Sequence, residues 1–161
     1  MKRNPLGYIN IERLYRGGNM TDSPFLYMKE NSKTVLWNDS ADPKELKDAL
    51  TWGIVGATCN PVIALSALKA DKDYWNARMR EYAKSHLTAT EGEIGWELVK
   101  ELSINAAKIL EPEFEKYYGR NGRLSIQTDP RNFRDAKALT DQAVTFSKLA
   151  KNIIVKIPVT S

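Results

Sequence analysis

Short apolar segments rich in β-branched residues alternate with helix-forming segments along most of this chain, and no other feature limits the possible folds as strongly. We expect four strands, at residues 34–38, 54–58, 123–129 and from Asn152 onward. Helices are expected between them, at residues 43–50, 61–69, 71–118 and 135–151. Strands and helices that alternate in this way need right-handed crossovers and form a parallel sheet. The sequence therefore predicts an α/β fold.

Residues at the ends of the expected helices support these boundaries. Asp42 is placed to cap the helix at 43–50, and Gly53 ends it. Pro61 starts the next helix. In residues 71–118, apolar side chains recur at three- and four-residue spacings, which indicates packing faces rather than a cofactor site.

The first 33 residues differ from the rest of the chain. They are rich in Gly, Asn, Ser and Pro and contain one short helical candidate, at residues 9–15. We interpret residues 1–33 as an N-terminal extension and residues 34–161 as the folded portion.

Two parallel α/β architectures fit the expected strands. A nucleotide-binding doubly wound sheet would carry a Gly-rich phosphate loop after its first strand, and no such loop is present. The other architecture is a (β/α)8 or TIM barrel, which typically needs about 250 residues. Because this chain has 161 residues, we expect only the first four strands of such a barrel.

Composition excludes several classes of function. The net charge of +4 arises from 24 basic and 20 acidic side chains that are scattered along the chain. A nucleic-acid-binding protein needs a clustered basic face, so we expect no nucleic-acid partner. With one cysteine, Cys59, and one histidine, His86, the chain offers neither a disulfide framework nor a Cys/His metal site.

The sequence also predicts where the protein is found. Residues 1–8 lack the apolar core of a signal peptide. No segment approaches the ~18 consecutive apolar residues that a membrane span needs. We therefore expect a cytoplasmic protein with no membrane partner.

Lys156 lies within a continuous apolar, β-branched segment at residues 152–160, which is typical of a strand covered on both faces. Burial disfavours the ammonium form, so a buried lysine becomes a neutral amine that can attack a carbonyl and form a Schiff base. Alternatively, the stem of Lys156 packs in the protein while its charged end reaches water.

Polar side chains lie at or near the carboxyl end of each expected strand. They are Asp39, then Thr58 and Asn60, then Gln127, then Lys156. In a parallel barrel these ends meet on the face where active sites are built. The set suits Schiff-base chemistry, because lysine supplies the nucleophile, the carboxylate can move a proton, and the amides can orient a substrate or a water molecule.

Four motifs resemble the transaldolase family. Residues 56–61 (Gly-Ala-Thr-Cys-Asn-Pro) resemble its Asn-Pro signature, and residues 155–160 (Val-Lys-Ile-Pro-Val-Thr) resemble the segment around its Schiff-base lysine. Residues 38–42 are similar to the first-strand segment with its aspartate, and residues 119–131 to its third-strand segment. The resemblance covers residues 34–161 in the expected order.

The resemblance implies a function. Lys156 would form an imine with a ketose phosphate, and a dihydroxyacetone unit would then pass to an aldose phosphate, as in the pentose phosphate pathway. Asp39 would be the acid–base group. Asn60 and Thr58 would bind the substrate, and Thr160 would support them. Such chemistry needs no metal and no cofactor.

Two positions depart from the family pattern. Cys59 replaces the usual Thr or Ser, and we interpret it as a small packing residue rather than a reactive thiol. Gln127 stands where classical transaldolases mostly have glutamate and the related fructose-6-phosphate aldolases have glutamine. A class I aldolase that releases its three-carbon product is therefore an alternative, although the long helical region at 71–118 is similar to that of the larger transaldolases.

The expected barrel is incomplete, since the family's phosphate-binding arginine and serine lie on later strands. We expect either a homo-oligomer or a half-barrel that pairs with a missing C-terminal half, because an uncovered sheet edge favours aggregation. A non-catalytic half-barrel that serves as an assembly module is a further alternative.

Overall fold

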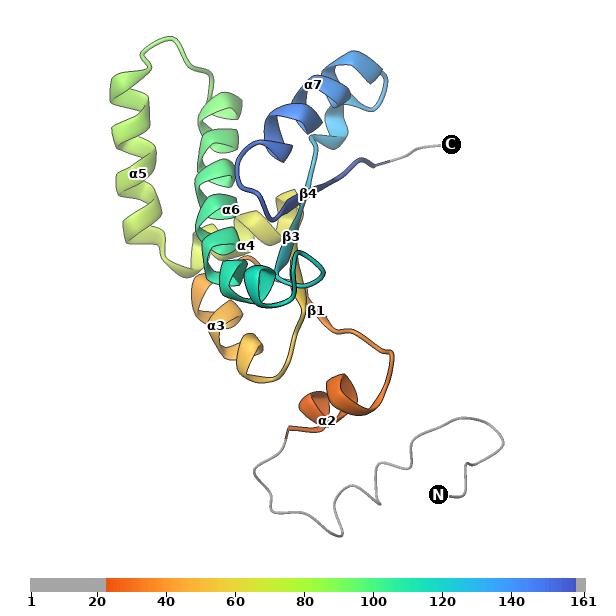
Figure 1. Ribbon diagram of the computed structural model, residues 1–161. Helices are drawn as coiled ribbons and strands as arrows, with labels where there is room; N and C mark the ends of the chain where they lie inside the picture. Colours follow the sequence, from red (N-terminus) through yellow and green to blue (C-terminus); the bar gives the residue numbers. More distant parts are fainter. Residues whose placement is uncertain (1–22, 159–161) are drawn as a thin grey trace.

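The computed structural model describes residues 23–158 and contains one parallel sheet (Figure 1). Its order is β1-β2-β3-β4, so consecutive strands are neighbours. The strands are β1 (Trp37–Asn38), β2 (Gly56–Cys59), β3 (Arg123–Gln127) and β4 (Ile153–Lys156). All four expected strands are confirmed, each shorter than its expected segment. Consecutive order in a parallel sheet is the arrangement found in a (β/α)8 barrel, here with part of the barrel present.

Seven helical segments accompany the sheet in the described residues. They are α2 (Pro24–Asn31), α3 (Pro43–Thr51), α4 (Pro61–Ala70), α5 (Lys72–Ser85), α6 (Glu91–Lys116), the short 3₁₀ helix η1 (Pro130–Asn132) and α7 (Ala136–Ser147).

Helix α2 was not predicted, because its segment was interpreted as part of an extension; the helical candidate at 9–15 lies outside the described residues. The Leu26 side chain lies against Gly53, the turn that ends α3. Lys29 pairs with Glu113 near the end of α6 at 3.8 Å. Helix α2 therefore packs on the folded portion.

The expected helical region at 71–118 is two antiparallel helices, α5 and α6, because a capping box interrupts it. The Thr90 hydroxyl accepts a hydrogen bond from the Glu93 backbone N–H at 3.3 Å, and the Glu93 carboxylate accepts one from the Thr90 N–H at 2.7 Å. This reciprocal pair satisfies donors that a helix start leaves unpaired. Asp42 caps α3 as predicted, accepting from the Lys44 and Glu45 N–H groups at 2.9 Å.

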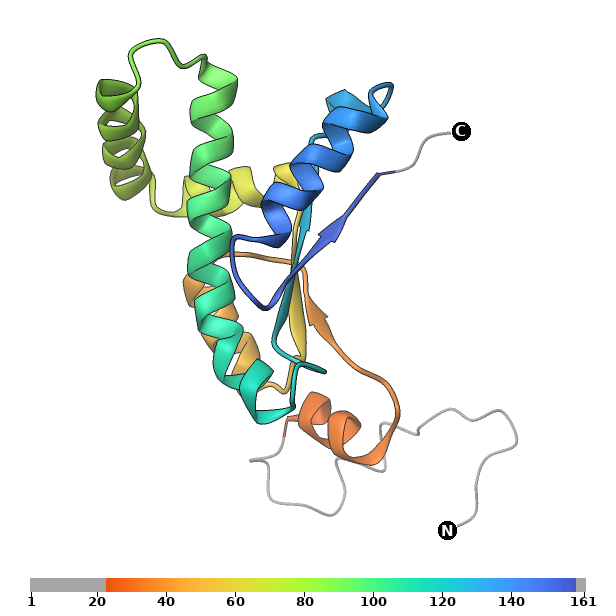
Figure 2. The ribbon, with the colours of Figure 1, turned by 45° about the horizontal axis from the view of Figure 1, so that its top comes forward.

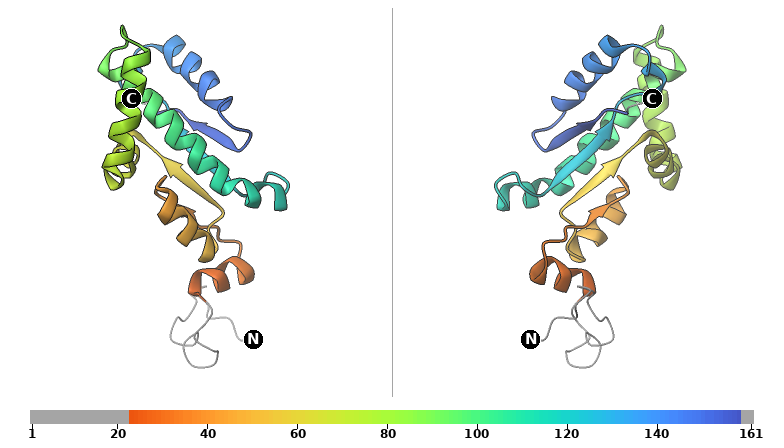
Figure 3. Two further views of the ribbon diagram at one scale, coloured as in Figure 1. Left: turned by 90° about the vertical axis from the view of Figure 1, so that its left-hand side faces the viewer. Right: turned by 90° about the vertical axis from the view of Figure 1, so that its right-hand side faces the viewer.

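The helices after β1 lie on one side of the sheet (Figure 2), and the two side views in Figure 3 show the strands covered by helices from one direction and uncovered from the other. Exposure alternates along β3, where Leu124 and Ile126 are fully buried and their neighbours are half-buried. The buried side chains pack on α6 and α7, chiefly Leu102, Ala106, Leu110 and Phe146. We call the uncovered side the open face.

The expectation that the Lys156 strand is covered on both faces is wrong for this chain. Ile153 is buried against the helices, whereas Ile154 is 36% exposed and Lys156 is also exposed. The strand has helices on one face only within the described residues. A β-branched segment indicates a strand, but it does not show which part of the protein covers the second face.

Buried Asn152 fixes the start of β4. Its side-chain Nδ2 donates hydrogen bonds to the carbonyl oxygens of Ala107 in α6 and of Gly122 before β3, both at 2.8 Å. Its own carbonyl accepts from the Leu124 N–H at 3.0 Å. One residue therefore joins α6, β3 and β4. These hydrogen bonds hold the two strands in a fixed position relative to each other and to α6.

Within residues 23–158 we find no helix that has the length and apolar character of a membrane span. The same part of the chain contains no group of three or more His, Cys, Asp and Glu side chains suited to a metal ion.

Candidate active site

Asp39 and Thr58 lie at the carboxyl ends of β1 and β2 and contact each other directly. The Thr58 hydroxyl donates a short hydrogen bond to the Asp39 carboxylate. Strand register accounts for the contact, since Asn38 pairs with Ala57 and the next residues along both strands are therefore level. Thr58 was predicted to bind substrate, and here its hydroxyl also holds the predicted acid–base group.

Gln127 and Lys156 lie at the carboxyl ends of β3 and β4. They are register partners, so both side chains leave the sheet on the same side. Thr58 pairs in register with Ser125, which is two residues before Gln127 and therefore on the same face. The open face thus carries a carboxylate, a hydroxyl, an amide and an amine at one end of the sheet.

Asn60 has a structural role in addition to the one predicted. Its side-chain carbonyl accepts hydrogen bonds from the Val62 and Ile63 backbone N–H groups at 2.9 Å, and it therefore caps α4. The Asn60 NH2 group is the part of the side chain that can bind a substrate oxygen. Thr160, the remaining predicted residue, lies outside the described residues.

Cys59 points away from the open face. Its side chain is 2% exposed and belongs to the core between the sheet and the helices. Burial raises the pKa of the thiol to about 11, although a hydrogen bond with Ser103 acts in the opposite direction. A thiol in this position is protonated at neutral pH, as expected for a packing residue.

Sequence reasoning missed a cluster around Asp129, two residues after Gln127. The nearly buried carboxylate accepts hydrogen bonds from the Trp96 indole Nε1 at 3.0 Å and from the Arg131 guanidinium at 2.6 Å. Hydrogen bonding to Arg131 is the main cause that lowers the Asp129 pKa. The sequence Asp129-Pro130-Arg131 could have indicated this cluster, because an aspartate before a proline is typical of the start of a helix, and Asp129 caps η1. The cluster anchors the end of β3 to α6.

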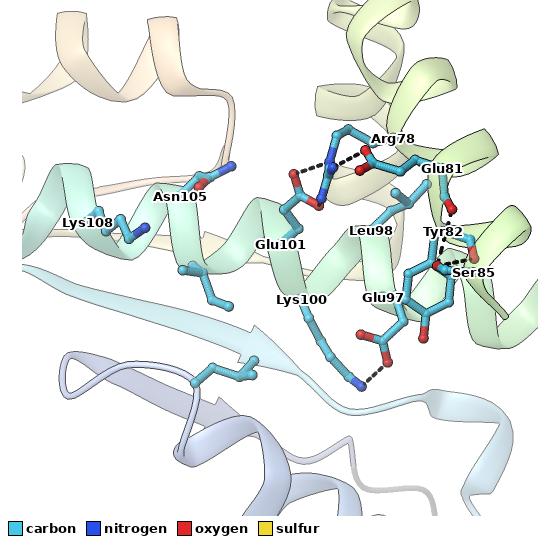
Figure 4. A pocket seen from close by; sticks show the side chains of 12 residues that line it. Arg78, Glu81, Tyr82, Ser85, Glu97, Leu98, Lys100, Glu101, Asn105 and Lys108 are labelled. Atoms are coloured by element: carbon cyan, nitrogen blue, oxygen red, sulfur yellow. Dashed lines mark hydrogen bonds and ion pairs between the residues drawn. The ribbon is translucent and has the colours of Figure 1, made fainter.

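A hollow of about 470 Å³ lies away from the open face, along α5 and α6 (Figure 4). All of its charged residues except Lys108 form ion pairs with one another. Arg78 Nε lies 2.9 Å from a Glu101 carboxylate oxygen, and Lys100 Nζ lies 2.5 Å from Glu97. Because these charges are already compensated, we do not assign a site there. Asp39 instead lines a hollow of about 290 Å³ between α3 and α4.

The fold and the open face define an α/β protein of the parallel-barrel class with polar groups at the carboxyl ends of its strands. Comparison with known families gives a more specific result: the model of the Transaldolase/Fructose-6-phosphate aldolase family matches residues 36–161. The chain belongs to this family.

Individual relatives agree with the family match. The chain is 34% identical to a transaldolase of Mycobacterium ulcerans over 125 residues, which cover 75% of this chain and 32% of the relative. It is 33% identical to a transaldolase of Mycolicibacterium smegmatis over 151 residues, 88% of this chain and 39% of the relative. For a transaldolase of Thermobifida fusca the identity is 33% over 110 residues, with coverage of 66% and 29%. The chain spans about a third of the length of the curated relatives it matches.

Proposed function

We propose that the open face takes part in transaldolase chemistry, in which Lys156 forms an imine with a ketose phosphate and a dihydroxyacetone unit is transferred to an aldose phosphate. The observation that carries the proposal is the register pair of Gln127 and Lys156, next to the contact between Thr58 and Asp39 on the same face. The matched family is named for this activity. The chain spans about a third of the length of its relatives.

The proposed steps assign one task to each side chain. The Lys156 amine adds to the ketone, and loss of water gives the imine. Asp39 takes the proton from the substrate hydroxyl, the carbon–carbon bond beside it breaks, and the electron pair remains on the dihydroxyacetone unit as an enamine. The aldose leaves. Reversal of these steps with a different aldose completes the transfer, so no electrons are lost and no redox partner is needed.

A class I aldolase is the second candidate, and Gln127 favours it. In cleavage, the enamine takes a proton instead of an acceptor aldose, and water then releases dihydroxyacetone from the lysine. A non-catalytic assembly module is the third candidate, and the exposure of Lys156 favours it. A desolvated lysine is the usual Schiff-base nucleophile, and an exposed one is less suited to the reaction.

Trapping the imine tests the proposal. Protein is incubated with fructose 6-phosphate and borohydride, which reduces an imine to a stable amine, and the intact mass is measured. We expect a sugar adduct that Lys156→Arg loses and that Lys148→Arg, at an exposed lysine after α7, retains. An adduct in all three proteins would indicate nonspecific glycation. No adduct in any of them would support the assembly module.

Addition of erythrose 4-phosphate separates transfer from cleavage. A transaldolase forms a seven-carbon ketose phosphate and glyceraldehyde 3-phosphate in equal amounts. An aldolase releases glyceraldehyde 3-phosphate and free dihydroxyacetone whether or not the acceptor is present. Product analysis by mass spectrometry distinguishes these outcomes.

A further inference from the structure

Asp129 is a nearly buried carboxylate that the proposed reaction does not use. It lies two residues after Gln127, where the chain leaves β3, and it is 6% exposed. A carboxylate is costly to bury unless hydrogen bonds satisfy its oxygens. The contacts of Asp129 therefore indicate what this side chain does.

Both oxygens of the Asp129 carboxylate accept several hydrogen bonds. Oδ1 accepts from the Arg131 backbone N–H at 2.9 Å, and Oδ2 accepts from the Trp96 indole N–H at 3.0 Å. The Arg131 guanidinium donates to both oxygens, with Nε at 3.0 Å from each and Nη2 at 2.6 Å from Oδ2. A carboxylate only accepts, whereas an amide also carries two N–H donors. An amide could not replace this carboxylate, because in either orientation its NH2 group would face an N–H donor.

The backbone at Asp129 is held as well. Its N–H donates to the side-chain carbonyl of Gln142 in α7 at 2.6 Å. One residue earlier, the N–H of fully buried Thr128 donates to the Lys156 carbonyl at 3.1 Å, which joins the carboxyl ends of β3 and β4. The contacts of Asp129 with α6 and α7 therefore lie one residue from a hydrogen bond to the backbone of Lys156.

The candidate active site needs such anchors. Gln127 and Lys156 are the last residues of their strands. Strand ends open more readily than strand centres, because fewer hydrogen bonds and packing contacts hold them. A reacting amine needs a fixed geometry, and a displacement of about 1 Å caused by a remote change can lower a rate by about 100-fold. Contacts outside the sheet can prevent that displacement.

We propose that Asp129 is a positioning residue of the candidate active site, and that it holds the ends of β3 and β4 so that Gln127 and Lys156 stay in register on the open face. Asp129 acts through the backbone, and it moves no proton in the reaction because donors occupy its oxygens. The anchoring rests on the hydrogen bonds around Asp129. Its effect on catalysis rests on the function proposed above.

Hydrogen exchange of single backbone N–H groups, followed by NMR without substrate, tests the anchoring. The Leu124 N–H is the internal reference, since it donates to the Asn152 carbonyl at 3.0 Å near the other end of the same two strands. We expect Asp129→Asn to raise the ratio of the Thr128 to the Leu124 exchange rate at least about 10-fold. A merely structural role would speed both N–H groups by the same factor, because both would exchange through global unfolding.

Two further variants locate the effect. Trp96→Phe removes the indole donor and keeps a ring that can pack on Phe146, whose ring centre lies 5.6 Å from that of Trp96. It should raise the same ratio by a smaller factor, and it supplies the measurement if Asp129→Asn does not fold. Asp135→Asn is the matched control, because it makes the same substitution at the cap of α7, where asparagine caps about as well as aspartate. It should leave the ratio unchanged.

Imine trapping with fructose 6-phosphate and borohydride tests the consequence for the amine. We expect Asp129→Asn to lower the rate of adduct formation at saturating sugar at least about 10-fold, and Asp135→Asn to leave it unchanged. The exchange ratio is measured without sugar and is scored separately. If the wild type forms no adduct, the proposed function is contradicted, and the exchange ratio still decides whether Asp129 anchors the two strand ends.

Two outcomes would overturn the proposal. The first is an exchange ratio that Asp129→Asn, or Trp96→Phe in its place, leaves unchanged. The second is an adduct that forms in Asp129→Asn at the wild-type rate, since the amine would then react without the anchor.

Discussion

Gln127 and Lys156 are register partners at the carboxyl ends of β3 and β4, so the amide lies next to the amine on the open face. An amide can orient a water molecule through hydrogen bonds, but it cannot accept a proton at neutral pH. A carboxylate at the same position can do both. The identity of residue 127 therefore decides whether this side chain contributes to proton transfer beside Lys156.

We predict that Gln127→Glu increases transfer relative to cleavage. The carboxylate would bind the catalytic water more strongly and restore the residue that classical transaldolases mostly carry. The measurement is the ratio of seven-carbon ketose phosphate to free dihydroxyacetone, formed from fructose 6-phosphate and erythrose 4-phosphate. Gln127→Ala is the control and should lower both products. An unchanged ratio in Gln127→Glu would show that residue 127 does not control the fate of the enamine.

A pair of glycines gives a prediction about stability. Gly122 has φ of +70°, and a Cβ added there would lie 2.1 Å from the backbone nitrogen of Phe114. Gly122→Ala should therefore lower the free energy of unfolding by several kcal/mol, about 3 or more, since backbone rather than a flexible side chain must move. Urea denaturation measures the effect.

Gly95 provides the matched control. It lies within α6, and a Cβ added there would meet no atom within 4 Å. Gly95→Ala should raise the free energy of unfolding by about 0.5–1 kcal/mol, because alanine has the higher helix propensity. Similar effects at Gly122 and Gly95 would contradict the geometry of the turn before β3.

Asn152 gives a second prediction about stability. Asn152→Ala removes two hydrogen bonds at 2.8 Å and leaves the carbonyl groups of Ala107 and Gly122 without this donor. We expect a loss of about 2–4 kcal/mol in the free energy of unfolding. Asn105→Ala, at a half-buried position on α6, should be neutral or slightly stabilising in the same urea titration. Equal effects at the two positions would mean that Asn152 does not join the three elements.

Local signals in the sequence predicted most of the fold. The capping aspartate at Asp42 and the prolines at 43 and 61 correctly mark the starts of α3 and α4. The Thr90 capping box was not used, and two helices were therefore treated as one helical region. Helix α2 was missed because its Ser-Pro start lies in a segment rich in loop residues, and its contact with Gly53 depends on tertiary structure.

Side-chain contacts across strands could not be predicted from the sequence. The types and order of Asp39, Thr58, Gln127 and Lys156 indicated that they share one end of a parallel sheet, at the carboxyl ends of its strands, and the structure places them at that end. The hydrogen bond from Thr58 to Asp39 depends on the register of β1 and β2, and β1 is much shorter than its expected segment. The exposure of Lys156 depends on what covers the open face, which no pattern within its strand can reveal.

Cys59 provides a prediction about pH. The pKa of the thiol is raised from 9.0 to about 11 in the folded protein by burial, so the folded state holds this proton more tightly than the unfolded state. Its contribution to the free energy of unfolding is complete below pH 9 and is lost as the pH rises from 9 to 11. The difference in the free energy of unfolding between the wild type and Cys59→Ala should therefore shrink by about 2–3 kcal/mol across that window.

Urea denaturation at several pH values measures this difference. Because lysines and tyrosines titrate in the same pH range in both proteins, their contributions cancel when the value for Cys59→Ala is subtracted from that for the wild type. Reaction of the folded protein with iodoacetamide at pH 8 gives an independent test. The thiolate fraction should be about 100-fold lower than in the urea-unfolded chain, because two units separate the pKa values. Rapid alkylation of the folded protein, or a difference that stays constant with pH, would show that Cys59 reaches solvent and is not held in the core between β2 and the helices.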